Sequence, residues 1–407
     1  MKNKNKYPVC HLFYEEFPRD PRVRRYVNAL NEQDIKCIVI CSQKKGDAFF
    51  ENRNGNLIYR IPVSKKRSSF FLTFLEYFLF AGVSSLLLLY LFIRYRYRII
   101  HVHTLPDFLI FSALTEKLLG VKTILDLHEL FPELYMVRTG KGPHSTGARL
   151  LKIIEKLSVK MANRVVTIHD NAKNVFIARN KGLENRISVI MNGVDPEEFT
   201  DTKRTETDDF IIIYNGTINR IMNLEIIPDA LNILKNSMPE QDFIKIKFRL
   251  YGDGPAVGEI LESAKSFGLN NCVEYCGFLQ PEKMNKEILK SSVLVLPPLK
   301  NLYSDLFYTI KLVEMVYLRI PVIATRLNTY ELYYGEDSLF YFDSGNTRQL
   351  SEKIREVFYN KTLIAQKTEN AFNNYMKVSW DKMKLIYIKI IFDLLNRKFS
   401  LQQQHFD

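Results

Sequence analysis

The sequence lacks the cysteine patterns that mark disulfide-stabilised or zinc-binding domains. Its five cysteines are an odd number and include no Cys-x-x-Cys pair, so we expect buried free thiols in a reducing compartment. The first residues, MKNKNKYPVCHLFYEEF, are basic, but they lack the apolar core of a signal peptide. Both absences favour a cytoplasmic protein.

Repeats and compositionally biased segments are missing as well. The 17 glycines and 15 prolines follow no period and form no low-complexity tract, which excludes collagen-like, solenoid and disordered chains. Neither a zinc knuckle nor the interleaved basic and aromatic residues of nucleic-acid-binding modules occur, so no nucleic-acid partner is expected. A chain of 407 residues that is 46% apolar predicts two packed α/β domains of roughly 200 residues each.

The excess of positive charge is confined to one half of the chain. Residues 1–200 contain 31 Lys and Arg against 19 Asp and Glu, and the remainder contains 26 of each, so the whole formal charge of +12 falls in the first half. A basic half joined to a neutral half indicates that one domain alone binds an anionic partner. We expect this partner to be the anionic inner surface of a membrane or a lipid pyrophosphate.

One apolar run is long enough to cross a membrane. Residues 70–93 read FFLTFLEYFLFAGVSSLLLLYLFI, with Glu76 as the only charge. A span would carry the strands expected at 35–41 and 98–103 to opposite sides of the membrane. We therefore expect a pair of helices that is partly core and partly an interfacial surface, with a span or a re-entrant hairpin as the alternative. Basic residues flank the run on both sides: Lys65, Lys66, Arg67, Arg94, Arg96 and Arg98.

Strand-like and helix-like segments alternate through both halves of the chain. Such βαβ alternation is typical of doubly wound α/β domains, which bind ligands at the carboxyl ends of their strands. The expected domains are 1–200 and 201–380, and a helix at about 381–400 closes the first of them. Helices are expected at 21–32, 106–119 and 147–162. Strands are expected at 7–13, 35–41, 98–103, 121–126, 164–168 and 187–190, and then at 210–214, 244–251, 272–276, 293–296, 321–324 and 338–342.

From PRDPRVRRYVNAL at 18–30 to KLVE at 311–314, a series of motifs over nearly the whole chain resembles, in order, those of family 4 glycosyltransferases. The most specific stretch, HVHTLPDFLIFSALTEKLLGVKTILDLHELFPELY at 101–135, matches the paired HxxxPD and DxHDxxPE segments of a subgroup found in bacterial polysaccharide clusters. The resemblance implies a GT-B fold, in which two Rossmann-like doubly wound domains face a central cleft. It also implies a UDP- or GDP-sugar donor in the second domain, an acceptor in the first, and retention at the anomeric carbon without a metal. Other motifs follow in the family's order: PRDPRVRRYVNAL at 18–30, NGVD at 192–195, YNGT at 214–217, YGDGP at 251–255 and KLVE at 311–314.

The resemblance places the donor site in the second half. Glu314 is expected to bind the ribose hydroxyls one turn inside a helix whose amino end binds the diphosphate. Lys311 and Arg220 would neutralise the leaving diphosphate; a surface Lys–Glu pair and a solvated arginine are the ordinary alternatives. The remaining expected contacts with the nucleotide sugar are Gly216, Thr217, Gly252, Gly254, Phe278, Asp305 and Thr309.

Several positions depart from the family pattern. A second glutamate is replaced by Leu306, so its usual contact with the sugar hydroxyls is either absent or supplied by Asp305. An arginine and a lysine that face the diphosphate in relatives are replaced by Thr217 and Met222. Val257 stands where a dinucleotide fingerprint has its third glycine, which disfavours a dehydrogenase.

In the first half, His128 is the leading candidate for contact with the donor sugar or its phosphate. It ends a strand and matches the family's HD pair, although a histidine in a core is more often structural. Glu129 or Glu133 could orient the acceptor hydroxyl. Arg22 and Arg24 could steer an anionic acceptor, or they could be solvated residues of the first helix.

His103 and Asp107 of the HxxxPD segment complete the expected acceptor set. His101 and His103 share one face of a strand, but no third ligand follows at a useful spacing, so no metal site is expected. The absence of any Asp-x-Asp triplet likewise argues against a metal-dependent GT-A enzyme.

Together these features predict a retaining glycosyltransferase that is peripheral on the inner face of the cell membrane. It would transfer a sugar onto a membrane-associated, lipid-linked glycan in the synthesis of cell-surface polysaccharide, by front-face substitution and without a cofactor. Two alternatives stay open. One is a sugar-nucleotide 2-epimerase of the same fold, and the other is a non-catalytic membrane-associated homologue, suggested by Thr217, Met222 and Leu306.

Overall fold

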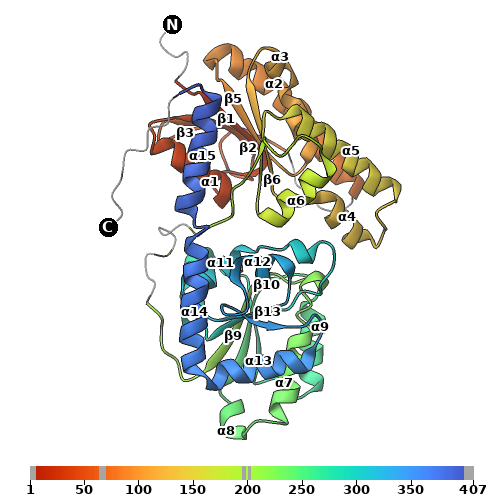
Figure 1. The fold of residues 1–407 in the computed structure, drawn as a ribbon, viewed down its shortest axis with the longest axis vertical. Coiled ribbons are helices and arrows are strands. Elements are labelled where there is room, and N and C mark those ends of the chain that lie inside the picture. Colours follow the sequence, from red (N-terminus) through yellow and green to blue (C-terminus); the bar gives the residue numbers. More distant parts are fainter. Residues whose placement is uncertain (1–5, 64–69, 195–198, 200–202, 398–407) are drawn as a thin grey trace. The chain divides into compact units, whose positions relative to one another are not determined.

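The computed structural model describes residues 6–63, 70–194, 199 and 203–397, and it divides the chain into two compact units (Figure 1). Unit 1 comprises the residues up to Asn192 together with those from Trp380, and unit 2 comprises Gly193–Ser379. From the sequence we expected this boundary at residue 200. Each unit contains a parallel sheet covered by helices on both faces, so the predicted α/β fold class is confirmed.

The sheet of unit 1 has eight strands in the order β3-β4-β2-β1-β5-β6-β7-β8, and every pair except β3 with β4 is parallel. The central strands are almost wholly buried because helices cover both faces. The strands are β1 (Val9–Glu16), β2 (Cys37–Ser42), β3 (Phe50–Arg53), β4 (Asn56–Ile61), β5 (Ile99–His103), β6 (Lys122–Leu127), β7 (Arg164–Thr167) and β8 (Ile187–Val189).

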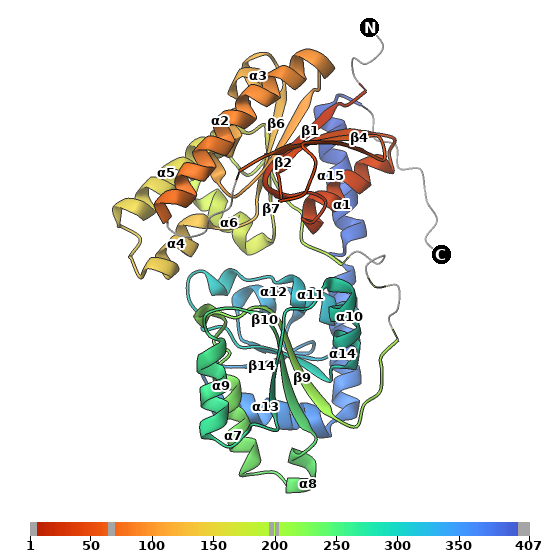
Figure 2. The same cartoon turned by 180° about the vertical axis from the view of Figure 1, so that it is seen from behind.

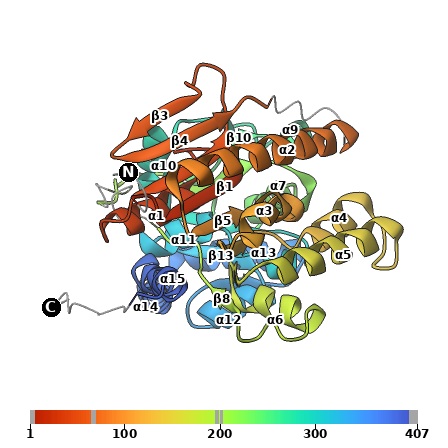
Figure 3. The same ribbon diagram turned by 90° about the horizontal axis from the view of Figure 1, so that it is seen from above.

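The chain direction determines which helices cover each face of this sheet. The crossover from β1 to β2 runs one way across the sheet, and the crossovers from β4 to β5 and onward to β8 run the other way. Right-handed connections therefore put the later helices on the opposite face. Figure 3 shows this division. The helix α15 (Trp380–Leu394) packs beside α1 (Pro21–Asn31). The other face carries α2 (Phe70–Tyr95), the 3-10 helix η1 (Asp107–Ala113), α3 (Leu114–Leu118), α4 (Phe131–Thr139), α5 (Thr146–Met161) and α6 (Asp170–Arg179).

Two features of unit 1 differ from the sequence analysis. Residues 70–95 form one continuous helix, so the prediction of a helix pair was wrong. The strands β3 and β4 were not expected, and they form a hairpin in which Asn54 and Gly55 adopt positive φ angles of 52° and 84°. An Asn-Gly pair with this geometry is a strong signal for a two-residue hairpin turn.

Unit 2 has a six-stranded parallel sheet in the order β11-β10-β9-β12-β13-β14, and Figure 2 shows helices on both of its faces. Every strand expected from the sequence is present, with shifted ends. The strands are β9 (Phe210–Thr217), β10 (Ile246–Asp253), β11 (Val273–Gly277), β12 (Val293–Leu296), β13 (Val322–Thr325) and β14 (Phe340–Phe342). The helices include α7 (Ile226–Lys235), α8 (Glu240–Phe243), α9 (Val257–Ser266), α10 (Pro281–Lys290), α11 (Ile310–Tyr317), α12 (Asn328–Tyr334), α13 (Thr347–Tyr359) and α14 (Lys361–Met376), with the short 3-10 helices η3 (Arg220–Met222) and η4 (Ser304–Leu306).

All five cysteines are free, and four of them are buried, as the sequence analysis expected. A few of its other expectations fall outside the described residues. These are the first five residues, the basic flank at Lys65, Lys66 and Arg67, the end of the NGVD motif at Asp195, and the end of the closing helix at 398–400.

Candidate functional site

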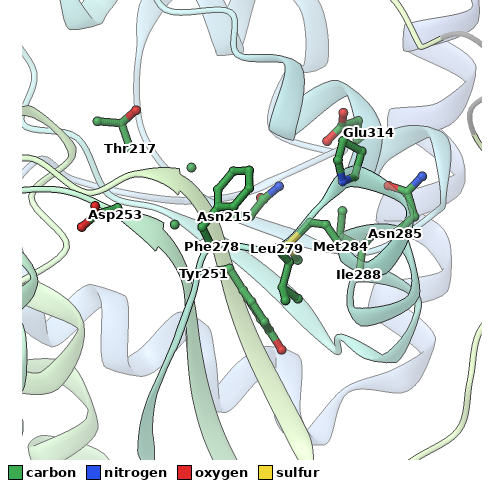
Figure 4. A pocket seen from close by; sticks show the side chains of 13 residues that line it. Asn215, Thr217, Tyr251, Asp253, Phe278, Leu279, Met284, Asn285, Ile288 and Glu314 are labelled. Carbon is green, nitrogen blue, oxygen red and sulfur yellow. The ribbon is translucent and has the colours of Figure 1, made fainter. Parts of the chain in front are cut away.

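Unit 2 contains a cavity of about 460 Å³ at the carboxyl ends of β9 and β10 (Figure 4). The two strands pair in register, so that Gly252 lies opposite Gly216. A cavity of this size and position is typical of a nucleotide site in a doubly wound domain. It is lined by Asn215, Gly216, Thr217, Tyr251, Gly252, Asp253, Phe278, Leu279, Pro281, Met284, Asn285, Ile288 and Glu314.

The two paired glycines allow the backbone and a lysine to come close together beside this cavity. Gly216 and Gly252 have φ angles of 127° and 120°, which favour glycine. A Cβ atom on Gly252 would lie 1.9 Å from the carbonyl oxygen of Gly216, and one on Gly216 would lie 2.5 Å from Cε of Lys311. Any side chain at either position would therefore displace the strand or the lysine.

The helix α11 contributes the charged groups. Thr309 caps its amino end, with Oγ1 accepting from the backbone N–H of Leu312 at 3.4 Å. Lys311 lies in the first turn with Nζ 5.3 Å from the centroid of the Tyr214 ring, and burial lowers the pKa of its ammonium group. Glu314, three residues further on, lines the cavity. A cation, a helix amino end and a carboxylate therefore lie within one turn of helix, which is a combination suited to a diphosphate and a ribose.

The other wall of the cavity is more apolar. Phe278 and Leu279 lie in the connection from β11 to α10, and Met284 and Ile288 lie on α10 itself. The side chain of Phe278 is 71% exposed, so a flat ring could stack against it without displacing other side chains. Asn285 is the polar group on this wall.

Three residues predicted for the donor site lie elsewhere in unit 2. The guanidinium of Arg220 is paired with Glu259 at 2.5 Å, and its side chain is 79% exposed. Asp305 accepts from the backbone N–H of Asn328 at 2.7 Å and from its side-chain amide at 2.6 Å. A Cβ atom on Gly254 would lie 1.9 Å from the carbonyl oxygen of Ile218, so this glycine is required by the turn itself. None of the three is among the residues that line the cavity.

Unit 1 has its own cluster of polar residues at the carboxyl ends of β5 and β6. Its centre is the buried Asp126, whose carboxylate accepts from Nε and from a terminal nitrogen of Arg22, both at 2.8 Å. The cap that Asp20 forms on the backbone N–H of Val23 fixes the first turn of α1 and so the position of Arg22. Burial would raise the pKa of Asp126, but Arg22 and the neighbouring His128 hold it well below its usual range.

A chain of buried histidines extends from the same carboxylate. Nδ1 of His103 lies 3.2 Å from Oδ2 of Asp126, and Nε2 of His103 lies 3.1 Å from Nδ1 of His11. His101 lies on the same face of β5 as His103, with its ring centroid 4.1 Å away. Burial lowers the pKa of all three imidazoles, so they are held in the neutral form.

The histidine cluster has the spacing of a metal site but not the charge. Ligand nitrogens of His11, His101 and His103 lie within 4.8 Å of one another, and His103, Asp126 and His128 form a second such group. His11 was not expected in this cluster, because it lies on the neighbouring strand β1, directly opposite His101 of β5. Arg22 already neutralises the carboxylate of this cluster, so a divalent ion would add two uncompensated buried charges. The geometry therefore favours a hydrogen-bonded chain.

The remaining residues predicted in unit 1 differ in exposure. The side chain of His128 is 21% exposed, and its Nε2 lies 3.1 Å from Oδ2 of Asp126. His128 therefore contacts both the buried cluster and the solvent. Glu133 is buried and paired with Arg179. Asp107 is also buried, and burial raises its pKa to about 8.

The two arginines of the first helix also differ. Arg22 is buried in the ion pair, so it is not on the surface where we expected it to be solvated or to steer an acceptor. Arg24 is partly exposed, with a terminal nitrogen 3.4 Å from the carbonyl oxygen of Pro18. Glu129 is partly exposed beside His128.

Two family models match the sequence. The model described as Glycosyltransferase Family 4 matches residues 22–198, and the model described as Glycosyl transferases group 1 matches residues 209–360. The first match includes β2 to β8 and the second includes β9 to β14. Between them the two models therefore span most of both sheets.

Two curated proteins are similar to the chain at low identity. A subunit of human phosphatidylinositol N-acetylglucosaminyltransferase is 22% identical over 311 residues, which is 70% of this chain and 60% of that protein. The phosphatidylinositol N-acetylglucosaminyltransferase gpi3 subunit of Schizosaccharomyces pombe is 22% identical over 277 residues, 67% of this chain and 55% of that one. The chain thus spans less than two thirds of the length of either relative.

Solved glycosyltransferase structures share the fold. Sucrose-phosphate synthase from Thermosynechococcus elongatus has a TM-score of 0.73 at 14% identity, covering 96% of this chain and 99% of that one. Anabaena HepE in complex with UDP has a TM-score of 0.66 at 12% identity, covering 95% of this chain and 99% of that one. WaaG, which is involved in lipopolysaccharide biosynthesis, has a TM-score of 0.65 at 13% identity, covering 94% of this chain and 99% of that one. These similarities confirm the predicted GT-B fold.

Proposed function

Because this chain belongs to glycosyltransferase family 4 and is therefore an enzyme that transfers sugars, we propose that it moves a sugar from a UDP- or GDP-sugar onto a lipid-linked glycan with retention at the anomeric carbon. The cavity in unit 2 is the observation that carries this proposal. Glu314 and the two paired glycines line the cavity, and the capped amino end of α11 lies one turn before Glu314 on the same helix. This combination suits a nucleoside diphosphate.

The donor is a nucleotide sugar in this proposal. The carboxylate of Glu314 binds the ribose hydroxyls, the apolar wall with Phe278 holds the base, and the amino end of α11 holds the diphosphate. The structure of HepE, which has the same fold, was determined with UDP and with UDP-glucose, and this supports a uridine nucleotide as the first donor to test.

The reaction would proceed by front-face substitution. As the bond between the sugar and the diphosphate breaks, negative charge develops on the leaving oxygen, and Lys311 together with the helix amides stabilises it. The acceptor hydroxyl attacks from the same face and passes its proton to the leaving diphosphate, so no residue of the enzyme acts as a nucleophile. Because Lys311 and the amides supply the positive charge, the proposal requires no metal ion.

His128 is the proposed contact of unit 1 with the transferred sugar. Asp126 lies 3.1 Å from Nε2 of His128 and therefore orients the ring, leaving Nδ1 to hydrogen-bond a substrate hydroxyl or phosphate oxygen. Glu129, the neighbouring residue, is the proposed group that orients the acceptor hydroxyl.

A lipid-linked acceptor at the inner face of the cell membrane is proposed from two observations. The excess positive charge lies in residues 1–200, and both curated relatives carry names that describe transfer to phosphatidylinositol. The basic half of the chain complements anionic headgroups. Synthesis of a cell-surface polysaccharide is the proposed pathway class.

An NMR assay of the purified full chain tests this proposal. Incubated with UDP-glucose, UDP-N-acetylglucosamine or a GDP-sugar and a lipid-extract acceptor, the protein is expected to give one product whose anomeric configuration matches that of the donor. Inversion would contradict the mechanism. Conversion of the donor without any acceptor would favour an epimerase, and the absence of any donor-induced rise in the melting temperature would remove the nucleotide site.

A further inference from the structure

The long helix α2 has two different apolar faces. Phe80, Leu88 and Leu91 are completely buried against the domain, and the ring of Phe80 packs edge-on to Tyr14 of β1 at 5.1 Å between centroids. The opposite face is apolar and exposed, at the one-turn and two-turn spacings of a helix. Its residues, with exposed fractions from 45% to 74%, are Leu75, Phe78, Leu79, Val83, Leu86, Tyr90 and Ile93.

Two neighbouring helices extend the exposed apolar face of α2. The helix α3 and the residue that follows it expose Leu118 at 80% and Leu119 at 59%. On α5 the side chains of Leu150, Ile153 and Leu157 are about half exposed, and they lie on one side of the helix. The helix η1 contacts α2, α3 and α5, and Figures 1 and 3 show all of these helices on the same side of the unit 1 sheet.

The exposed charged residues on α2, η1, α3 and α5 are all basic. The acidic residues of η1, α3 and α5, namely Asp107, Glu116 and Glu155, are all buried, and Glu76 of α2 is partly buried near Tyr14. The exposed charged residues on these elements are Arg94, Arg149, Lys156 and Lys160. An apolar face whose exposed charged residues on the same helices are all basic is the pattern of a surface that binds anionic lipid.

We propose that α2, α3 and α5 form one docking surface that lies in the headgroup region of an anionic phospholipid bilayer, without crossing it. The residues of this lipid-docking surface are Leu75, Phe78, Leu79, Val83, Leu86, Tyr90, Ile93, Leu118, Leu119, Leu150, Ile153 and Leu157, with the four basic residues above. The presence of this protein at a membrane rests on the proposed function; the new part is that α2, α3 and α5 contact the lipid and that α2 lies parallel to the bilayer.

The packing of α2 excludes a transmembrane orientation. By length and composition Leu72–Tyr95 could cross a membrane, and 28% of that window is buried inside the domain. However, α2 connects β4 to β5, and both strands belong to the same sheet on the same side of any membrane. Withdrawing α2 into a bilayer would also expose the part of the core that Phe80, Leu88 and Leu91 fill. The helix therefore lies parallel to the bilayer plane.

A second copy of the chain is a poorer occupant than lipid. In a two-fold dimer each surface faces its own equivalent, so Arg149, Lys156 and Lys160 of both copies would lie in one interface without an exposed acidic residue of η1, α2, α3 or α5 to pair with them. Anionic headgroups instead neutralise these side chains, and the long stems of the lysines can lie along the apolar surface while their ammonium groups reach the phosphates.

Flotation of the full chain with vesicles tests the proposal. We compare vesicles of phosphatidylcholine alone with vesicles that contain one quarter phosphatidylglycerol, in low and in high salt. The apolar variant carries L150S, I153S and L157S on α5, and the charge variant carries R149Q, K156Q and K160Q. The matched control carries I244S and L302S, which replace side chains of unit 2 that are 68% and 67% exposed.

The wild type and the control are expected to float with the anionic vesicles, and the apolar variant is expected to bind at least about tenfold more weakly. The charge variant should lose binding to anionic vesicles only, and salt should weaken the wild type in the same way. Undiminished binding of both variants would overturn the proposal, as would a wild-type dimer that the apolar variant converts to a monomer. The UDP-induced rise in melting temperature should be the same for every variant, so failure of the donor site would be seen separately.

Discussion

Arg22 and Asp126, which are 104 residues apart, form a two-point ion pair inside unit 1, with both N···O distances at 2.8 Å. A terminal nitrogen of Arg22 also donates to the carbonyl oxygen of Ile190 at 2.8 Å. One side chain thus ties the first turn of α1 to the end of β6 and to the segment after β8. The pair holds the carboxylate charged beside His103 and His128.

Replacing Arg22 by alanine should therefore destabilise the protein severely. The carboxylate of Asp126 would stay buried without its cation, which typically costs about 3–5 kcal/mol. Urea unfolding of the wild type and the variant measures this loss. The matched control is Arg24→Ala in the same helix turn, where the side chain is partly exposed, and we expect a change below about 1 kcal/mol. Equal losses for the two variants would contradict the structural role of Arg22.

The buried histidines predict a stability that depends on pH. The pKa of His101 is lowered well below its usual value by burial, so below about pH 6.5 the unfolded chain takes up a proton that the folded chain cannot. The wild type should therefore lose stability relative to His101→Phe as the pH falls from 7 to 5, by up to about 1.4 kcal/mol per pH unit. The raised pKa of Asp107 acts in the opposite direction, but it is common to both proteins and cancels.

Unfolding by urea at several pH values measures this difference. As a control, His144→Gln replaces an exposed residue of the loop before α5, and its stability should follow that of the wild type at every pH. If the difference between the wild type and His101→Phe is constant from pH 7 to 5, the imidazole is not held neutral.

Two glycines of unit 2, Gly252 and Gly258, should respond in opposite ways to replacement by alanine. Gly252→Ala would place Cβ 1.9 Å from the carbonyl oxygen of Gly216 at a φ of 120°, so we expect a loss of at least about 2 kcal/mol. Gly258→Ala in α9 meets nothing within 4 Å, and it should stabilise the protein by up to about 1 kcal/mol. Thermal unfolding separates the two, and a harmless Gly252→Ala would mean that the strands do not approach as closely as described.

The fold was predictable wherever the signal is local. Nearly every strand is identified by a short continuous apolar run between helix-like segments. Such runs occur because the parallel strands are buried on both faces of the sheet. We did not predict the hairpin of β3 and β4, although the Asn-Gly pair at 54–55 is a strong signal for a hairpin turn. The strand NLIYRI that follows is part of the sheet, beside β2.

The site was predictable only where a motif names it. The motifs place Glu314, Gly216 and Gly252 at one site, and these residues line one cavity; their contact with the donor stays a prediction. The clustering of His11, His103, Asp126 and Arg22 depends on the strand order. That order places β1 beside β5 and β5 beside β6, and spacing along the chain does not reveal it. Arg22 could not be distinguished from its partly exposed neighbour Arg24, since both follow the same Asp-Pro pair in the sequence.

Glu314→Ala should remove donor binding and leave the fold intact. The carboxylate lines the cavity one turn inside α11, and hydrogen bonds to a charged group are worth about 1.5–3 kcal/mol, which corresponds to a loss of roughly 10- to 100-fold in affinity for UDP. Calorimetric titration measures the affinity, and the melting temperature without ligand checks the fold. For comparison, Glu331→Ala removes an exposed partner of Arg326 and should leave the affinity unchanged. An unchanged affinity in Glu314→Ala would refute the assignment of the ribose contact.

Lys311 and Arg220 compete for the role of the cation that stabilises the leaving diphosphate, and the structure favours Lys311. Its ammonium group lies beside Gly216, which lines the cavity, whereas Arg220 is exposed and paired with Glu259. Lys311→Met should lower kcat by about 10²- to 10³-fold, because charge on the leaving group develops only in the transition state, and should weaken UDP binding much less. Lys311→Arg should not restore activity, since the close approach of Gly216 leaves no room for a guanidinium. If Arg220→Met lowers kcat while Lys311→Met does not, the exposed arginine must leave Glu259 and enter the site during turnover.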